Sequence, residues 1–317
     1  MGYDIADPRI TIRNLSDDWQ GCADLINEAE AVMLACADFD LVAQRIQMGK
    51  SVFITHERLF KKGLIKLLDP RTWRIAKFCR SVRNKPVYLL AIGNNAAKDF
   101  RLLGFHRQKI YQFGYFPQTD HYNPEQLQKG SDQCRVLWVG RFVGFKRPLM
   151  ALKAFRKLDN NFTLTMAGDG ALHSKAKVYA KKHGIAVTFL GNIPAGEVET
   201  QMLQSHILLS TSHKGEGWGA VINEGMNRGC AVVCAREIGC ADTLATDDNA
   251  VLFDTYSVRS LRRALQEAAH RQQELSQKGY DTITREFNAE VAAQRFAVLT
   301  KDIDKSMWAT GLCSKVF

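Results

Sequence analysis

Short apolar runs alternate along the chain with longer segments in which apolar residues recur at helical spacing. The apolar runs are rich in β-branched residues, so we interpret them as strands. Near-continuous apolar strands separated by helices are typical of parallel sheets covered on both faces, so the pattern predicts an α/β fold. The strands are expected at Ile10–Ile12, Ala31–Cys36, Val52–Thr55, Val87–Ala91, Ile110–Phe113, Val136–Gly140, Leu164–Ala167, Val187–Leu190, Ile207–Ser210, Ala231–Cys234 and Val251–Phe253.

One stretch, Phe116 to Gln133, interrupts this alternation. It is polar and contains two prolines, as expected of a linker. We therefore predict two Rossmann-like parallel-sheet domains facing a cleft, residues 1–117 and 133–290. Residues 291–317 would add a C-terminal helix and tail, with an amphipathic helix over about Glu290–Trp308. Ligands of such folds bind at the carboxyl ends of strands, so the loops there are the places to search for chemistry.

Composition narrows the class of protein. The 317 residues are 46% apolar and 24% charged, as in soluble globular proteins, and no run resembles a membrane-spanning helix. The start, MGYDIADPRI, lacks the features of a secretory signal, and the eight cysteines occur singly, so we expect a cytoplasmic protein with reduced thiols. The net charge of +10 fits anionic partners, namely a sugar nucleotide, an acidic membrane surface or nucleic acid.

Glycines cluster in GEGWGAVINEGMNRG, residues 215–229. A glycine-rich turn that opens a helix offers free backbone N–H groups and the positive end of the helix dipole, which suit a phosphate. Glu216 and Glu224 are eight residues apart, about 12 Å along a helix, so they can hold two parts of one long ligand. Alternatively, the glycines form a plain turn and both glutamates are solvated.

A second candidate element is VGRFVGFKRP, residues 139–148. The predicted strand ends at Gly140, and Arg141 and Lys146 stand in the loop before a helix that begins near Pro148. Arginine offers a planar fork to phosphate oxygens, and lysine offers a mobile charge. Two ordinary surface cations are the alternative, but the carboxyl end of a strand favours binding.

Four ordered motifs give the second half a resemblance to a known family. They are VGRFVGFKRP, MAGDG (166–170), VTFLGNIP (187–194) with HILLSTSHKGEGWGAVINEGMNRG, and REIGCADTL…NAVLF (236–253). Together they cover about residues 133–300 and resemble the family-4 retaining glycosyltransferases (glycosyl transferases group 1) of GT-B fold and bacterial surface-polysaccharide type. The family's signature of two glutamates separated by seven residues is met by Glu216 and Glu224.

The resemblance implies a function and residue roles. The enzyme would move a sugar from a UDP- or GDP-sugar to a glycan or lipid-linked acceptor in cell-surface polysaccharide synthesis. Arg141 and Lys146 would bind the donor diphosphate, and preorganised cations there stabilise the departing nucleotide. Glu216 would hold sugar hydroxyls and Glu224 the ribose. The other donor-binding positions would be Gly140, Asn192, Ile193, Gly217, Trp218 and Gly219.

The resemblance also implies how the reaction proceeds. In this family the acceptor is thought to attack from the face that the nucleotide leaves, so configuration is retained without an enzyme nucleophile, and none is assigned. We expect no cofactor, because the nucleotide sugar is itself a substrate. We also expect no metal: of the two DxD strings, Asp38-Phe39-Asp40 fits the start of a helix and Asp302-Ile303-Asp304 lies in the amphipathic tail, where carboxylates usually face solvent.

The first half carries two further features. His56 follows a predicted strand, where the family often places a histidine near the sugar, so it is a catalytic candidate; a structural histidine is the alternative. Residues 58–85 carry ten cations and one acid, interleaved with apolar side chains that include Trp73. This basic amphipathic segment fits peripheral binding to the inner face of a membrane and a polyprenyl-linked acceptor; a solvated basic face is the alternative. We expect no nucleic acid, because no recognition module is visible.

The start of the chain departs from the family. Residues 86–117 resemble the end of its first domain, but no glycine-containing loop follows a strand near residue one. The first strand is central in a doubly wound sheet, so we expect a shortened N-terminal domain with a gap in its sheet or rearranged strands. A truncated, catalytically weak homologue that binds a sugar nucleotide or a partner protein is therefore the alternative to an active transferase. A GT-B sugar-nucleotide epimerase is a third hypothesis, and the glycine spacing disfavours a nicotinamide dehydrogenase.

Overall fold

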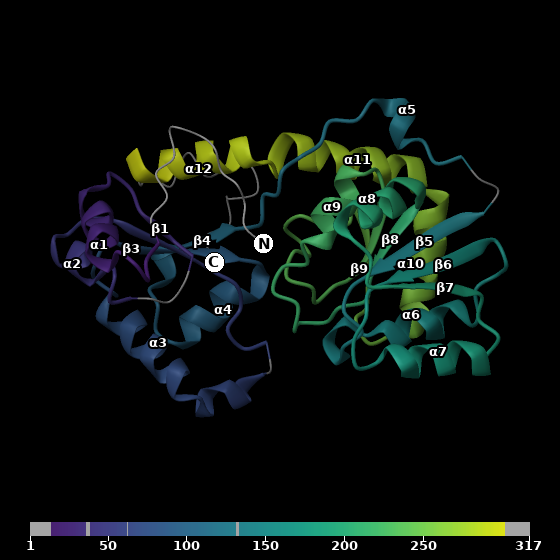
Figure 1. Cartoon of the computed structure of the whole chain (residues 1–317), viewed down its shortest axis with the longest axis horizontal. Helices are drawn as coiled ribbons and strands as arrows, with labels where there is room; N and C mark the ends of the chain where they lie inside the picture. Colours follow the sequence, from purple (N-terminus) through teal and green to yellow (C-terminus); the bar gives the residue numbers. More distant parts are fainter. Residues whose placement is uncertain (1–13, 36–38, 62, 131–132, 302–317) are drawn as a thin grey trace.

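The computed structural model describes residues 14–35, 39–61, 63–130 and 133–301, and contains two parallel sheets, each covered by helices (Figure 1). The first sheet has the order β1-β2-β3-β4, with β1 at Met33–Leu34, β2 at Val52–His56, β3 at Val87–Ile92 and β4 at Ile110–Phe113. Its helices are α1 (Trp19–Glu28), α2 (Ala43–Gln47), the 3₁₀ helix η1 (Leu64–Leu68), α3 (Pro70–Ser81), α4 (Asn94–Leu102) and the 3₁₀ turn η2 (Arg107–Lys109).

The second sheet has the order β10-β9-β8-β5-β6-β7. In chain order this is the doubly wound arrangement, in which the strand order reverses between the first strand, β5, and the fourth, β8. Ligands bind at that switch point. The strands are β5 (Cys134–Val139), β6 (Phe162–Ala167), β7 (Val187–Gly191), β8 (Ile207–Ser210), β9 (Ala231–Ala235) and β10 (Ala250–Phe253). The helices are α5 (Pro124–Leu127) in the linker, η3 (Gly144–Lys146), α6 (Pro148–Phe155), α7 (His173–Lys182), α8 (Ala195–Gln204), α9 (Val221–Asn227), α10 (Val258–His270) and α11 (Gln272–Glu286).

The predicted strands are present wherever the structure describes them. Ile110–Phe113 and Ile207–Ser210 have the predicted bounds, whereas the predicted strand Ala31–Cys36 is reduced to the two residues of β1. The predicted strand Ile10–Ile12 lies outside the described residues. The expected gap in the first sheet is wrong: its described strands pair consecutively, β1 with β2, β2 with β3 and β3 with β4.

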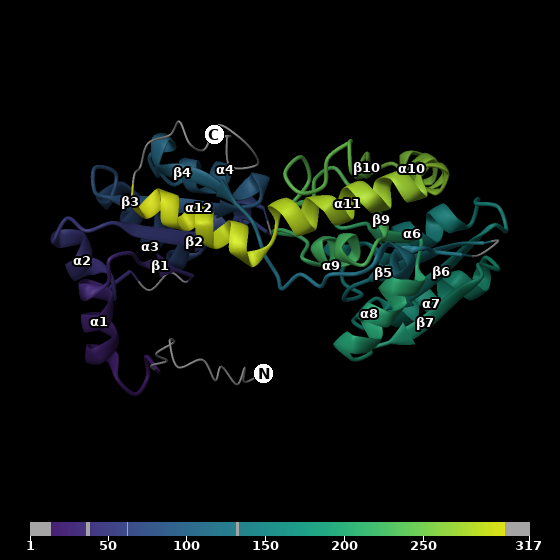
Figure 2. The same cartoon turned by 90° about the horizontal axis from the view of Figure 1, so that it is seen from above.

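The last helix, α12 (Ala289–Lys301), returns to the first sheet, whereas α11 lies over the second (Figures 1 and 2). Phe296 packs edge-on against Phe53 of β2 with ring centroids 5.2 Å apart, and Leu299 is buried there. The predicted helix over Glu290–Trp308 is present up to Lys301, and its remainder lies outside the described residues. The chain thus crosses between the two sheets at the linker and again before α12.

The described cysteines have no disulfide partners. Cys79, Cys230, Cys234 and Cys240 are buried, and desolvation raises the pKa of the Cys79 thiol to about 12. Such thiols stay protonated and pack as small apolar side chains.

Candidate active site

The loops that follow β5, β6 and β7 pack backbone against backbone. Gly140 donates its N–H to the carbonyl of Ala167 (3.0 Å), and Gly168 donates to the carbonyl of Gly191 (2.6 Å). Gly168 has φ +125°, and a Cβ at this position would overlap the carbonyl oxygen of Gly140. Only glycine allows the two backbones to approach so closely. The packing of Gly168 against Gly140 therefore fixes the start of the loop that carries Arg141 and Lys146.

The loop after β5 is also tied to the loop after β8, its neighbour in the sheet. The hydroxyl of Thr211 donates to the carbonyl of Lys146 (2.7 Å) and accepts from the indole N–H of Trp138 (2.9 Å). The N–H of His213 donates to the carbonyl of Phe145 (3.0 Å). These bonds hold Lys146 in place through its backbone and leave its ammonium group free to reach across the loop.

Lys146 and Glu216 form an ion pair between these two loops, and each side chain is only 16% exposed. Ser212 adds a hydroxyl that donates to the same carboxylate (3.1 Å). Arg141 is exposed, and its guanidinium lies 6.0 Å from the centre of the Phe145 ring, while the Lys146 ammonium lies 5.7 Å from it. The structure therefore brings Arg141, Lys146 and Glu216 together, as the sequence predicts.

Glu224 lies in the first turn of α9 and is exposed as a residue. The surrounding protein nevertheless desolvates its carboxyl, and this raises the pKa of Glu224; Glu199 adds to the rise, while Arg228 and Lys146 oppose it. Lys146 thus acts electrostatically on both glutamates of the signature. The two carboxylates face one cationic region, as the spacing argument requires.

The glycine loop between these glutamates is packed on both sides. Gly219 has φ +101°, and a Cβ there would lie 2.7 Å from Ile238 Cδ1. A Cβ on Gly217 would overlap the carboxylate of Glu57 from the first sheet. Trp218 is fully buried; its indole N–H donates to Asn223 (2.8 Å), and its carbonyl accepts from the N–H of Cys240 (3.0 Å).

Asn192 and Ile193 follow β7, at the edge of the second sheet. Asn192 is exposed and Ile193 is half-buried. Among the described contacts, none joins either side chain to Lys146 or to the two glutamates. β6 separates β7 from β5, so a ligand bound at Lys146 would have to extend past β6 to contact Asn192 and Ile193.

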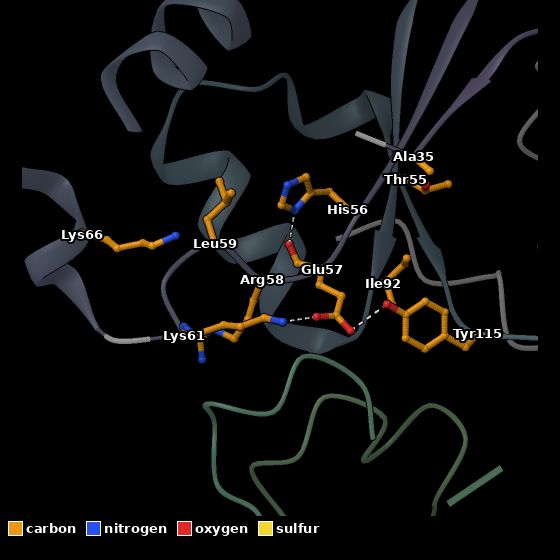
Figure 3. Close-up of a pocket in the computed structure, with 10 residues that line it drawn as sticks. All are labelled: Ala35, Thr55, His56, Glu57, Arg58, Leu59, Lys61, Lys66, Ile92 and Tyr115. Atoms are coloured by element: carbon orange, nitrogen blue, oxygen red, sulfur yellow. Dashed lines mark hydrogen bonds and ion pairs between the residues drawn. The ribbon is translucent and has the colours of Figure 1, made fainter. Parts of the chain in front are cut away.

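The first sheet faces this region with a hollow of about 470 Å³ (Figure 3). His56, at the end of β2, lines it and lies edge-on to Phe100, with ring centroids 5.2 Å apart. His56 Nδ1 lies 2.5 Å from the carbonyl oxygen of Glu57. Because that oxygen only accepts, Nδ1 carries the proton, and in the neutral ring Nε2 keeps a lone pair. The other lining residues are Ala35, Thr55, Glu57, Arg58, Leu59, Lys61, Lys66, Ile92 and Tyr115.

Two residues of this hollow were not predicted from the sequence. Glu57 accepts from the hydroxyl of Tyr115 (2.8 Å) and forms an ion pair with Lys61 (Figure 3). Desolvation, followed by the hydrogen bond to Glu57 and by the charges of Glu57 and Glu216, raises the pKa of Tyr115. Glu57 directly follows a strand, and this position could have indicated a site residue. Tyr115 lies between β4 and the linker, and its sequence pattern resembles that of any core aromatic residue.

The carboxyl ends of the two sheets abut. Arg58 is buried and donates to the carbonyl of Lys214 in the glycine loop (2.7 Å), while its other nitrogen lies 3.4 Å from Asp99. Asn94 donates its backbone N–H to the carbonyl of Gly239 (3.0 Å) and accepts from the hydroxyl of Thr243 (2.8 Å). The hollow beside His56 thus lies next to the loop that carries Glu216, because Glu57 contacts Gly217 and Arg58 contacts Lys214.

This fold and site belong to a known class of enzyme. Residues 121–283, just over half of the chain, match the family described as "Glycosyl transferases group 1", and the chain belongs to that family. Its fold is the GT-B fold of glycosyltransferase structures. The family match does not favour the alternative of a homologue that only binds its ligands.

Two curated relatives and one solved structure show the range of similarity. An uncharacterized glycosyltransferase of Methanocaldococcus jannaschii is 29% identical over 146 residues, which are 46% of this chain and 41% of that protein. A Campylobacter jejuni α-1,4-N-acetyl-D-galactosaminyltransferase is 40% identical over 62 residues, 18% of this chain and 17% of that one. The chain thus spans less than half of either relative. The structure of Anabaena HepE with UDP superimposes with a TM-score of 0.69 at 14% identity, covering 87% of this chain and 80% of that one.

Among the described residues, no helix is long and apolar enough to span a bilayer, and no three His, Cys, Asp or Glu side chains lie close enough to share a metal ion.

Proposed function

We propose that the protein is a retaining, metal-independent glycosyltransferase of family 4 that takes its sugar from a UDP- or GDP-sugar. The observation that carries this proposal is the ion pair between Lys146 and Glu216 at the switch point of the second sheet, with Arg141 beside it. Cations and carboxylates side by side suit a ligand that joins a diphosphate to a polyhydroxylated sugar. The similar HepE structure is a complex with UDP, which supports the same kind of donor.

Each residue has a role in this proposal. Arg141 and Lys146 bind the diphosphate and stabilise the negative charge that grows on it as the anomeric C–O bond breaks. Glu216, freed from Lys146, accepts hydrogen bonds from sugar hydroxyls. Glu224 accepts from the ribose. The loop backbone around Gly140, Gly217, Trp218 and Gly219 lies along the donor, and Asn192 and Ile193 flank its base.

The acceptor approaches from the wall of the first sheet, from the face that the nucleotide leaves. His56 offers the Nε2 lone pair to a hydroxyl in the hollow, because its Nδ1 proton is held by the carbonyl of Glu57. Residues 1–117 then form the acceptor domain, residues 133–290 the donor domain, and residues 291–317 the C-terminal helix and tail; α12 returns to the first sheet.

We place the reaction on the cytoplasmic face of a membrane, in the synthesis of a surface polysaccharide from a glycan or polyprenyl-linked acceptor. Large apolar side chains of the 58–85 segment stand in solvent, with Leu64 63%, Leu68 81% and Trp73 59% exposed. Cations surround them, and this combination suits a surface of anionic lipid. The name of the Campylobacter relative gives that protein a diphospho-undecaprenol-linked acceptor.

The test is a panel of UDP-, GDP- and ADP-sugars, scored by the shift in thermal unfolding and then by nucleotide release with membrane extract. We expect one sugar nucleotide to stabilise the protein and to release its nucleotide when extract is added. If no sugar nucleotide of the panel stabilises the protein, the proposed function is wrong.

A further inference from the structure

A second hollow, of about 380 Å³, adjoins the one beside His56. The two share His56, Leu59 and Lys66, so they are neighbouring parts of one depression on the first domain. The remaining lining of this outer hollow comes from Phe39, Asp69, Arg71, Thr72, Arg74 and Ile75.

The outer hollow is positively charged. Asp69, the only acid among its described lining residues, is bound by Arg71 through hydrogen bonds of 3.0–3.2 Å and also caps α3. Arg71 is therefore neutralised locally. Lys66 and Arg74 make no ion pair with a described carboxylate, although the charge of Lys66, after Arg71, helps to lower the pKa of Asp69, so the described lining carries three cations against one carboxylate.

Apolar side chains border these cations in an unusual way. Leu64 and Leu68 flank Lys66 on η1, Trp73 precedes Arg74 on α3, and Ile65 is 68% exposed. Side chains of this kind are normally buried, and exposing several in one place marks a surface that meets an apolar partner. These four side chains do not line the outer hollow itself but stand on η1 and α3, the elements that supply Lys66 and Arg74. A cationic hollow with exposed apolar side chains on the same elements is complementary to an anion that carries a hydrocarbon tail.

We propose that the outer hollow binds the phosphate or diphosphate of a lipid-linked acceptor. Lys66 and Arg74 hold the phosphate, the hydrocarbon tail lies against Leu64, Ile65, Leu68 and Trp73 toward the bilayer, and the acceptor's sugar extends into the inner hollow beside His56. This inference rests on the proposed function, because the sugar placed beside His56 is the one that receives the transferred residue. The outer hollow would bind the phosphate of the acceptor at a place separate from the donor site.

The test measures the binding of farnesyl diphosphate by calorimetry, with UDP present at saturation so that the donor site is occupied. The double variant Lys66→Gln/Arg74→Gln is compared with Lys77→Gln/Arg83→Gln, which removes the same two charges from exposed positions on and just after α3 outside the hollow. We expect the first variant to bind the probe about tenfold or more weakly, since two charge-assisted contacts are lost, and the second to bind as the wild type does. An equal loss in both variants would overturn the proposal.

Two further measurements separate the sources of affinity. Inorganic pyrophosphate should bind much more weakly than farnesyl diphosphate, and Leu68→Ser should weaken the binding of farnesyl diphosphate only. Equal affinities for the two probes would overturn the role of the tail.

UDP affinity and the thermal midpoint should be unchanged in Lys66→Gln/Arg74→Gln. If UDP binds the wild type but farnesyl diphosphate does not, the acceptor inference fails while the donor proposal stands. If neither UDP nor GDP binds the wild type, the proposed function is wrong.

Discussion

The ammonium group of Lys146 pairs with the carboxylate of Glu216 across the loops that follow β5 and β8. Each group therefore neutralises the other before a donor arrives. Under the proposed function, a diphosphate would compete with Glu216 for Lys146, and the exchange would release the carboxylate for sugar hydroxyls. Lys146 would then bind the diphosphate of the donor, and Glu216 would bind its sugar.

Removing Glu216 should have opposite effects on binding and on transfer. Glu216→Ala leaves Lys146 without its carboxylate partner, so we expect UDP or GDP to bind at least as tightly as to the wild type. Transfer should fall roughly 10²–10³-fold, the cost of one lost transition-state contact. Calorimetry and a single-turnover assay measure the two effects. An unchanged rate of transfer would refute the role of Glu216.

The carboxyl of Glu224 gives a pH-dependent prediction. Its pKa in the folded protein lies above the ordinary value of 4.5, mainly through desolvation, so its ionised form costs the folded state stability at pH 7. This cost disappears as the pH falls toward 4.5. We therefore expect Glu224→Gln to raise the urea midpoint at pH 7, with a gain that shrinks on acidification. A gain independent of pH would contradict this account.

The same variant should weaken nucleotide binding at pH 7, because the ribose hydroxyls donate to a carboxylate. Wild-type affinity should fall as the pH is lowered through the raised pKa of Glu224, and Glu224→Gln should show no such fall. Titrations between pH 7 and 4.5 measure the difference.

Gly168 tests the packing of the loops beneath the cations. Gly168→Ala adds a Cβ that overlaps the carbonyl of Gly140, in addition to backbone strain at φ +125°. Gly184→Ala is the matched control, since Gly184 also has positive φ (+60°) but has no atom within 4 Å of the added Cβ. We expect Gly168→Ala to cost about 1–3 kcal/mol more than Gly184→Ala in urea unfolding, the usual cost of overpacking. Equal costs would show that the loops move apart freely.

If the 58–85 segment binds membranes, replacing Leu68 should weaken binding to lipid vesicles more than replacing an exposed leucine elsewhere on the surface. Leu68→Ser should weaken sedimentation with phosphatidylglycerol vesicles about tenfold, because burying a leucine side chain contributes about 1.5–3 kcal/mol. Leu102→Ser on α4, where the leucine is 58% exposed, should bind as the wild type does. Equal binding of all three proteins to these vesicles would exclude this surface.

The proximity of three candidate donor-site residues could be predicted from the sequence, because it depends on local strand patterns and on the order of the strands. Arg141, Lys146 and Glu216 each follow a strand with a clear apolar pattern, and the doubly wound order makes β5 and β8 neighbours. The carboxyl ends of adjacent parallel strands meet, so residues about 75 apart in sequence come together.

The rest depended on packing between distant segments. Trp218 is in the glycine motif, but its side chain turns into the core beside Phe287, 6.1 Å between ring centroids, and nothing in the local pattern reveals this. Glu57 meets Gly217 only because Arg58 and Asn94 dock the first sheet onto the second. The consecutive order of the first sheet likewise depends on which strands find partners, which spacing alone does not determine.

The most direct test of the central claim is the affinity of Lys146→Ala for UDP and GDP, measured by calorimetry beside the wild type. Lys153→Ala, which removes an equal charge from an exposed position on α6, is the control. The account predicts that one nucleotide binds the wild type and the control equally, and binds Lys146→Ala about tenfold or more weakly. Binding to Lys146→Ala with unaltered affinity, or no binding of either nucleotide to the wild type, would contradict it.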